Sequence, residues 1–302
     1  MSERPLAEIF DQVSNWGRWG TDDQLGTLNL IDPAAALRAI RGVTNPNPIS
    51  CARSMSPLMT GGSSPLLHLM TATGHDAKLV GKSIAADWLG FSIHGFGLTH
   101  LDAPSHEAWN HKLYNGRDAS LVTSAGAGWG SVELAVEKIV GRGVLIDAPR
   151  ARGVPWLEPG SVLKPDDLDR ALAMQGTELA PGDVLIVRTG RDVRSGPKDI
   201  NLRKDGAAGL DSECLPWLHE KSISVLVSDV VHDPLPGTNP ECDMPIHAIG
   251  IVAMGLWLID NAHLEKLAAA CHEQSRWDFL FVSPALPVKR GTGSPLNPLA
   301  FF

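Results

Sequence analysis

Cysteine is scarce in this sequence and never occurs in a close pair. The four cysteines among the 302 residues are Cys51, Cys214, Cys242 and Cys271, and none belongs to a C-x-x-C pair. This spacing argues against a zinc site built from thiolates and gives no disulfide framework. We therefore expect reduced thiols and a cytoplasmic location, because disulfides are rare in the cytosol.

Long hydrophobic runs and basic clusters are also absent. No stretch approaches eighteen uninterrupted apolar residues, and residues 1–17 lack the apolar segment of a signal peptide, so we expect no membrane span. The formal net charge is −8, without a run rich in lysine or arginine, which argues against binding to nucleic acid or to an anionic membrane. The composition favours a small neutral or anionic molecule as the partner, bound in a local pocket.

The motifs of several large enzyme classes are missing as well. The chain contains no G-x-S-x-G, no G-x-G-x-x-G and no P-loop, so a serine hydrolase, a dinucleotide enzyme and an NTPase are all disfavoured. Apolar residues make up 43% of the chain and charged residues 20%, as is ordinary for a soluble globular enzyme.

Buried strands and helices alternate along the chain. Apolar runs predict the strands, and runs led by proline or acidic residues predict helices. After a β-like region from 48 to 100, strands are expected at 144–148, 223–230, 256–260 and 279–288, and residues 180–190 are expected to form a turn followed by a strand. Helices are expected at 33–40, 165–175, 247–255 and 261–273. This order is typical of a sheet with parallel pairs covered by helices. We predict one mixed α/β domain over residues 1–302, with residues 1–45 as an N-terminal arm and helix.

The stretch HGFGLTHLDAPSH, residues 94–106, gathers three histidines and an aspartate. If residues 98–102 form a strand, His100 and Asp102 project to one face with Cα atoms about 6–7 Å apart. Imidazole nitrogen and carboxylate oxygen are good ligands for Zn²⁺ or Mn²⁺. Pro104 ends the strand because it removes a ladder donor, and His106 can then turn back toward the same pocket. The pattern predicts a metal site.

His94 stands apart in this stretch. A continued strand would place it about 20 Å from His100, so it reaches the same cation only if Gly95 and Gly97 fold the chain back. Otherwise we expect it to contact substrate or to pack in the core. The alternative for the whole cluster is that these are core or turn histidines whose ring nitrogens are satisfied by backbone groups.

Several segments together point to one family. They are THLDAPSH at 99–106, NWGRWGTDDQLGTLNLI at 15–31, DVLIVRTG at 183–190, HAIGIVAMG at 247–255 and GTGSPLNPLA at 291–300. With them the sequence resembles the metal-dependent cyclase family, which includes bacterial kynurenine formamidase and isatin hydrolase. The first segment matches the second half of the family signature, H-x-G-T-H-x-D-x-P-x-H. The resemblance is to the longer branch, whose members are about as long as this chain of 302 residues.

The resemblance implies a fold, a cofactor and an assembly. The implied fold is a swivelling β/β/α domain, a mixed sheet partly closed into a barrel with outer helices. The implied assembly is a homo-oligomer, a dimer or a tetramer. The implied cofactor is a divalent metal, Zn²⁺ or Mn²⁺. The residues that carry over as its ligands are His100, Asp102, His106, His247 and Asp260.

The chain departs from the family pattern at one ligand position. The first histidine of the signature falls on Phe96, and a phenyl ring cannot bind a metal. Asp260 occupies the place of a glutamate and is one methylene shorter. The ligands that remain could hold one metal, or two bridged by Asp102, and Phe96 makes the full binuclear site less favoured.

The resemblance implies a metal-dependent hydrolase that uses a metal-activated water on a small cyclic or aryl amide. An unligated histidine would then transfer protons; the candidate is His106, or His94 or His232 if His106 is a ligand. Two alternatives stay open, a lactone or ester hydrolase with the same metal site, and a non-catalytic binding protein whose site has decayed. Phe96, Trp16 and Trp19 are candidates to line an apolar substrate pocket.

Overall fold

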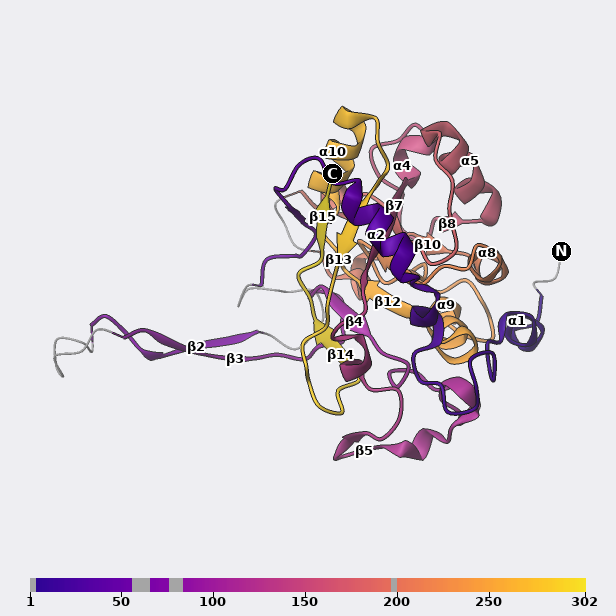
Figure 1. Cartoon of the computed structure of the whole chain (residues 1–302), viewed down its shortest axis with the longest axis horizontal. Helices are drawn as coiled ribbons and strands as arrows, with labels where there is room; N and C mark the ends of the chain where they lie inside the picture. Colours follow the sequence, from indigo (N-terminus) through magenta and orange to yellow (C-terminus); the bar gives the residue numbers. More distant parts are fainter. Residues whose placement is uncertain (1–3, 56–65, 76–83, 197–199) are drawn as a thin grey trace.

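A mixed sheet of nine strands runs through the middle of the structure, a computed structural model that describes residues 4–55, 66–75, 84–196 and 200–302. The sheet curls partly into a barrel and helices cover it (Figure 1). The fold class predicted from the sequence is confirmed. The strands of this sheet are β1 (Ile49–Ser50), β4 (His100–Asp102), β7 (Val140–Asp147), β9 (Val184–Arg188), β11 (Val225–Ser228), β12 (Trp257–Asp260), β13 (Asp278–Val282), β14 (Gly293–Pro295) and β15 (Leu299–Phe301).

The spatial order of the strands is β1-β15-β13-β7-β9-β11-β12-β4-β14. The four central strands, β7, β9, β11 and β12, are parallel, and the outer strands pair antiparallel. The helices are α1 (Leu6–Val13), α2 (Pro33–Arg41), α4 (Ala148–Ala151), α5 (Pro165–Gln175), α6 (Arg191–Ser195), α7 (Leu202–Asp205), α8 (Cys214–Glu220), α9 (Pro245–Ile249) and α10 (Glu265–Gln274). Shorter turns of helix are η1 (Gly26–Leu30), η2 (Tyr114–Gly116), η3 (Ala119–Leu121), η4 (Val132–Ala135) and η5 (Gly250–Met254).

Both faces of the central strands are buried. Along β7, Val144 and Ile146 belong to the apolar cluster that contains residues of α5 and α8, whereas Leu145 belongs to the cluster that contains Leu267 and Cys271 of α10. Successive side chains of a strand point to opposite faces, so a strand covered on both sides must be apolar at every position. This is why these strands read as continuous apolar runs in the sequence.

The predicted helices at 33–40 and 165–175 are confirmed, the first as α2 with Asp32 accepting a hydrogen bond from the Ala34 N–H at 2.9 Å. Helix α10 begins at Glu265 and not at 261, because the N–H groups of Asn261 and Ala262 donate to β11 and the residues after it before the helix starts. The last predicted strand was too long, since β13 ends at Val282 ahead of two prolines. None of the helices in the described ranges has the length and apolar content of a membrane span.

A hairpin of two strands, β2 (Leu67–Ala72) and β3 (Ala86–Gly90), projects as an arm from the body of the molecule (Figure 1). We call it the β2–β3 arm. Leu69 and Trp88 face each other across its strands, and they are 56% and 48% exposed. The remaining short strands lie on the body and pair among themselves; they are β5 (Val122–Thr123), β6 (Gly126–Ala127), β8 (Val162–Leu163) and β10 (Gly209–Leu210).

Candidate metal centre

Strand β4 brings the first two predicted ligands onto one face of the sheet. It lies between β12 and β14, and its register places Asp260 directly opposite His100 and Leu258 opposite Asp102. Leu101, between the two polar residues, points into the apolar core. Because β4 and β12 are antiparallel neighbours, alternation alone presents His100, Asp102 and Asp260 to the same space.

These three residues form an inner group that could hold a cation. One ligand atom from each lies within 4.8 Å of the others, and all three residues are buried. His100 Nδ1 lies 2.8 Å from the Leu98 carbonyl oxygen, and His100 Nε2 lies 3.4 Å from Asp102 Oδ1. The carbonyl fixes the proton on Nδ1, so the lone pair of Nε2 faces the carboxylates. This arrangement is common for histidines that bind metals.

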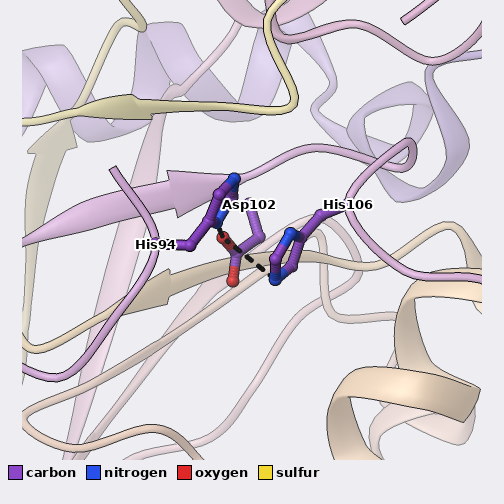
Figure 2. Close-up of side chains that lie close together, drawn as sticks. All are labelled: His94, Asp102 and His106. Carbon is purple, nitrogen blue, oxygen red and sulfur yellow. Dashed lines mark hydrogen bonds and ion pairs between the residues drawn. The ribbon is translucent and has the colours of Figure 1, made fainter. Parts of the chain in front are cut away.

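A second, outer group shares Asp102 with the first. It consists of His94, Asp102 and His106 (Figure 2), whose candidate ligand atoms again lie within 4.8 Å of one another. His94 Nδ1 lies 2.7 Å from Asp102 Oδ1 and His106 Nε2 lies 4.0 Å from it. The two imidazole rings stack with centroids 3.7 Å apart. Asp102 therefore belongs to both groups and would be a ligand shared between them.

His94 lies far closer to Asp102 than a continued strand would allow. Residues 93–98 bend instead of extending, and Gly95 has a φ of 149° that side chains rarely tolerate. The bend is held from the end of β12, where Asn261 Nδ2 donates to the Gly95 carbonyl at 2.7 Å. The Arg191 guanidinium of α6 donates to the Phe96 carbonyl at 2.8 Å. Folding back at Gly95 thereby brings His94 to the site.

His247 enters from helix α9 on the other side of the inner group. Its Nε2 lies 3.4 Å from Asp260 Oδ2 and 3.7 Å from Asp102 Oδ2, and its Nδ1 lies 2.7 Å from Asp233 Oδ2. The carboxylate of Asp233 also accepts the Ile246 N–H at 2.8 Å, so it caps α9 and orients the ring at once. Asp233 is not among the residues predicted from the sequence; the signal for it is its place just after the buried strand β11.

His232 follows β11 in a left-handed conformation, with a φ of 59°, and is fully buried against Asp260. His232 Nε2 and Asp260 Oδ1 lie 3.0 Å apart, but without the geometry of a hydrogen bond. Neither atom has a hydrogen-bond partner among the described residues, and the same is true of Asp102 Oδ2. Unsatisfied polar atoms at this depth are costly. Nitrogen and oxygen atoms that converge without bonding one another fit the donor set of a divalent cation.

The charges of the site are set by burial and by close pairs. Burial by itself would raise the pKa of Asp102, but the neighbouring imidazoles, led by His106, outweigh it and hold that pKa well below its usual range. Burial lowers the pKa of His106 to about 4 against the pull of Asp102, which leaves the lone pair of one ring nitrogen open near neutral pH. Burial also opposes protonation of His247, yet Asp260 and Asp233 prevail and raise its pKa well above the usual value.

A cavity of about 360 Å³ opens over both groups. Its apolar wall is formed by Phe96, Val231 and Met244. Two charged residues that were not predicted from the sequence, Glu107 and Arg203, also line it. Burial raises the pKa of Glu107. The cavity combines an apolar wall with a few polar groups, as is usual for small-molecule sites.

Trp16 and Trp19 are not among the described residues that line this cavity. The Trp16 indole N–H donates to the Val252 carbonyl at 2.7 Å and its ring packs edge-on against Phe10, while Trp19 lies under the guanidinium of Arg18. Trp16 therefore contacts the N-terminal segment and η5, and Trp19 contacts the N-terminal segment. Of the three residues predicted to line a substrate pocket, the structure places only Phe96 in this one.

Comparison with known proteins gives the family. Residues 56–232, more than half of the chain, match the family model described as "Putative cyclase". A solved structure of a novel cyclase is 28% identical, with all of both chains covered and a TM-score of 0.88. Isatin hydrolase A from Labrenzia aggregata is 21% identical over 84% of this chain and 93% of its own, with a TM-score of 0.62. A potential metal-dependent hydrolase with cyclase activity is 13% identical over 85% and 98%, with a TM-score of 0.55. No curated protein matches the chain significantly.

Proposed function

Because the chain belongs to the putative cyclase family, we propose that it is a metal-dependent hydrolase that acts on a small cyclic or aryl amide. The observation that carries this proposal is the pair of three-residue groups that share Asp102 at the floor of a cavity with an apolar wall. The ligand atoms are nitrogens and carboxylate oxygens, which suit Zn²⁺ or Mn²⁺. When bound, such an ion lowers the pKa of its water toward about 7 and polarises a carbonyl group.

The residues around the two groups supply the proton transfers. His106 is neutral near pH 7 because burial lowers its pKa to about 4, so its Nε2 can accept a proton at the floor of the cavity. Glu107 Oε1 lies 3.7 Å from that nitrogen, and its side chain is 35% exposed. The carboxylate of Glu107 lies beside the proton that His106 takes up, and His106 can return that proton to a leaving nitrogen. His94 and His232 remain candidates for this role if His106 is itself a ligand.

Metal content and hydrolysis test this function together. Protein purified without chelators should contain Zn²⁺ or Mn²⁺ in at least equimolar amount, and should hydrolyse formanilide or a simple lactam, while Asp102→Ala should do neither. Hydrolysis of phenyl acetate or a lactone without hydrolysis of any amide would favour the alternative of a lactone or ester hydrolase. Substoichiometric metal, with no gain of hydrolysis on adding either ion, would favour a binding protein whose site has decayed.

We also propose a homo-oligomer, a dimer or a tetramer, in which the β2–β3 arm packs against a second copy of the chain. A two-stranded hairpin is at best marginally stable in water, and this one exposes the Leu69–Trp88 pair. Light scattering should give a multiple of 32.3 kDa for the wild type and for the control Met174→Ser, whose residue is 62% exposed on α5. The double variant Leu69→Ser, Trp88→Ser should dissociate, and a wild-type monomer would refute this assembly.

Two broader expectations remain proposals. The four cysteines are free, and three of them are buried, which suits a reducing compartment and therefore the cytoplasm. Residues 1–302 are proposed to act as one domain with residues 1–45 as its N-terminal arm and helix. A single cooperative unfolding transition, seen at the same denaturant concentration by far-UV circular dichroism and by tryptophan fluorescence, would support one domain.

A further inference from the structure

One guanidinium group lies among the described residues that line the cavity over the metal groups. Arg203 is the only lysine or arginine among the described residues that line it, and the carboxylates that line it are Asp102, Glu107 and Asp260. The side chain of Arg203 belongs to the four-residue helix α7 and is exposed. No carboxylate of the described part of the chain lies within ion-pair distance of it. Its charge is therefore open to a ligand.

Arg203 is held in place from both sides. Its neighbour Leu202 is fully buried in a small apolar cluster that also contains Phe96 and Val231, so α7 is anchored to the cavity wall. The guanidinium itself lies over the Phe96 ring, 5.1 Å from the centroid. The backbone of Phe96 is held by the hydrogen bond that its carbonyl accepts from Arg191 at 2.8 Å, and its ring is buried in the same apolar cluster. Stacking of this kind orients an arginine and leaves the N–H donors at its edge available.

We propose that Arg203 binds a carboxylate group of the substrate, and that the substrate is an amphipathic anion. Its scissile carbonyl would lie at the His and Asp floor, its apolar body against Phe96 and Met244, and its carboxylate at Arg203. This inference rests on the proposed hydrolase function and names the substrate class for it. A planar guanidinium matches a carboxylate with two parallel hydrogen bonds. It also attracts an anion to a chain whose net charge of −8 would otherwise repel it.

The kinetic test compares two probes of similar shape, 4-formamidobenzoate with a carboxylate and 4-formamidobenzamide with a neutral carboxamide in its place. The wild type should prefer the anionic probe in KM, and Arg203→Met should reduce that preference about tenfold, as expected for a charge-assisted pair that is partly exposed. Arg203→Lys should keep part of the preference, since it retains the charge but not the planar fork. Lys204→Met removes the same charge one residue along α7 and should keep the wild-type preference, because Lys204 is not among the described residues that line the cavity.

A binding measurement separates this inference from the proposed function. Calorimetry on the metal-loaded protein would compare 4-aminobenzoate with 4-aminobenzamide as ligands, which requires no turnover. Arg203→Met should weaken the anion about tenfold relative to the amide, even if neither formamide is hydrolysed and the proposed function fails. The inference is overturned if Arg203→Met and Lys204→Met discriminate between the two ligands equally, because the carboxylate would then bind elsewhere, for example at the metal.

Discussion

Replacing Asn261 tests how the chain is bent so that His94 reaches the metal centre. Asn261 Nδ2 donates to the Gly95 carbonyl at 2.7 Å, and at 3.4 Å to that of Leu98, while its Oδ1 accepts from the Arg191 guanidinium at 2.7 Å. Asn261 is fully buried and has a φ of 55°. Asn261→Ala removes all of these hydrogen bonds and places an alanine in the left-handed region.

The expected cost follows from these contacts. A neutral hydrogen bond contributes about 0.5–1.5 kcal/mol and one to a charged group about 1.5–3 kcal/mol. The left-handed conformation costs an alanine about 1–2 kcal/mol more. Asn261→Ala should therefore lower the free energy of unfolding by about 3–6 kcal/mol. Asn261→Gly loses the same hydrogen bonds but tolerates this φ, so its loss should be about 1–2 kcal/mol smaller.

Two assays on these variants test the reasoning. Urea unfolding of the metal-free protein measures the stability terms, and calorimetric titration of Asn261→Gly with Zn²⁺ measures the site. Zn²⁺ affinity of the outer group should fall about 10–100-fold, as is usual when a residue that orients a ligand is removed. If stability falls as expected but the affinity and the stoichiometry for Zn²⁺ are those of the wild type, Asn261 does not position His94.

Three further predictions concern single side chains. Asp102→Ala should abolish binding of metal at both groups, since both use its carboxylate, and plasma emission spectrometry would show this; a single retained ion would mean that the groups are independent. His106, whose folded pKa is about 4 against about 6.5 when unfolded, binds its proton more tightly in the unfolded chain. The free energy of unfolding of the metal-free protein should therefore fall by about 3 kcal/mol as the pH falls from 6.5 through 4. His106→Gln should flatten this part of the plot of unfolding free energy against pH. Cys242 is the one cysteine that is not buried, and it should be the only thiol to react promptly with a disulfide reagent. Burial shields the other three thiols and raises the pKa of each, so Cys242→Ser should abolish the fast phase.

The sequence predicts well whatever depends on neighbours along the chain. Strand alternation is a property of adjacent residues, and it was enough to place His100 and Asp102 on one face. The continuous apolar runs of the central strands likewise indicated a sheet covered on both sides. Helix α5 could be predicted because its signals are local: a proline at its start and acidic residues in its first turn.

What the sequence could not give depends on contacts between distant segments. The bend at Gly95 is held by Asn261, 166 residues further on, so strand spacing pointed His94 away from the site. No motif in the sequence around Arg203 indicates a function, because this residue reaches the cavity only through the packing of its neighbour Leu202 with Phe96. The prediction that Trp16 lines the substrate pocket rests on its residue type alone. In the structure its indole N–H donates to the carbonyl of Val252.

The two groups that share Asp102 differ in what they must release to bind a cation. His247, beside the inner group, holds a proton to a pH well above the usual value because Asp260 and Asp233 flank it. A cation that uses its Nε2 must expel that proton, so its affinity rises with pH until the proton is lost. His106 of the outer group is already neutral near pH 7, since burial lowers its pKa to about 4, and it can bind without such an exchange. Mild acid should therefore weaken any binding that involves His247 before it weakens binding through His106.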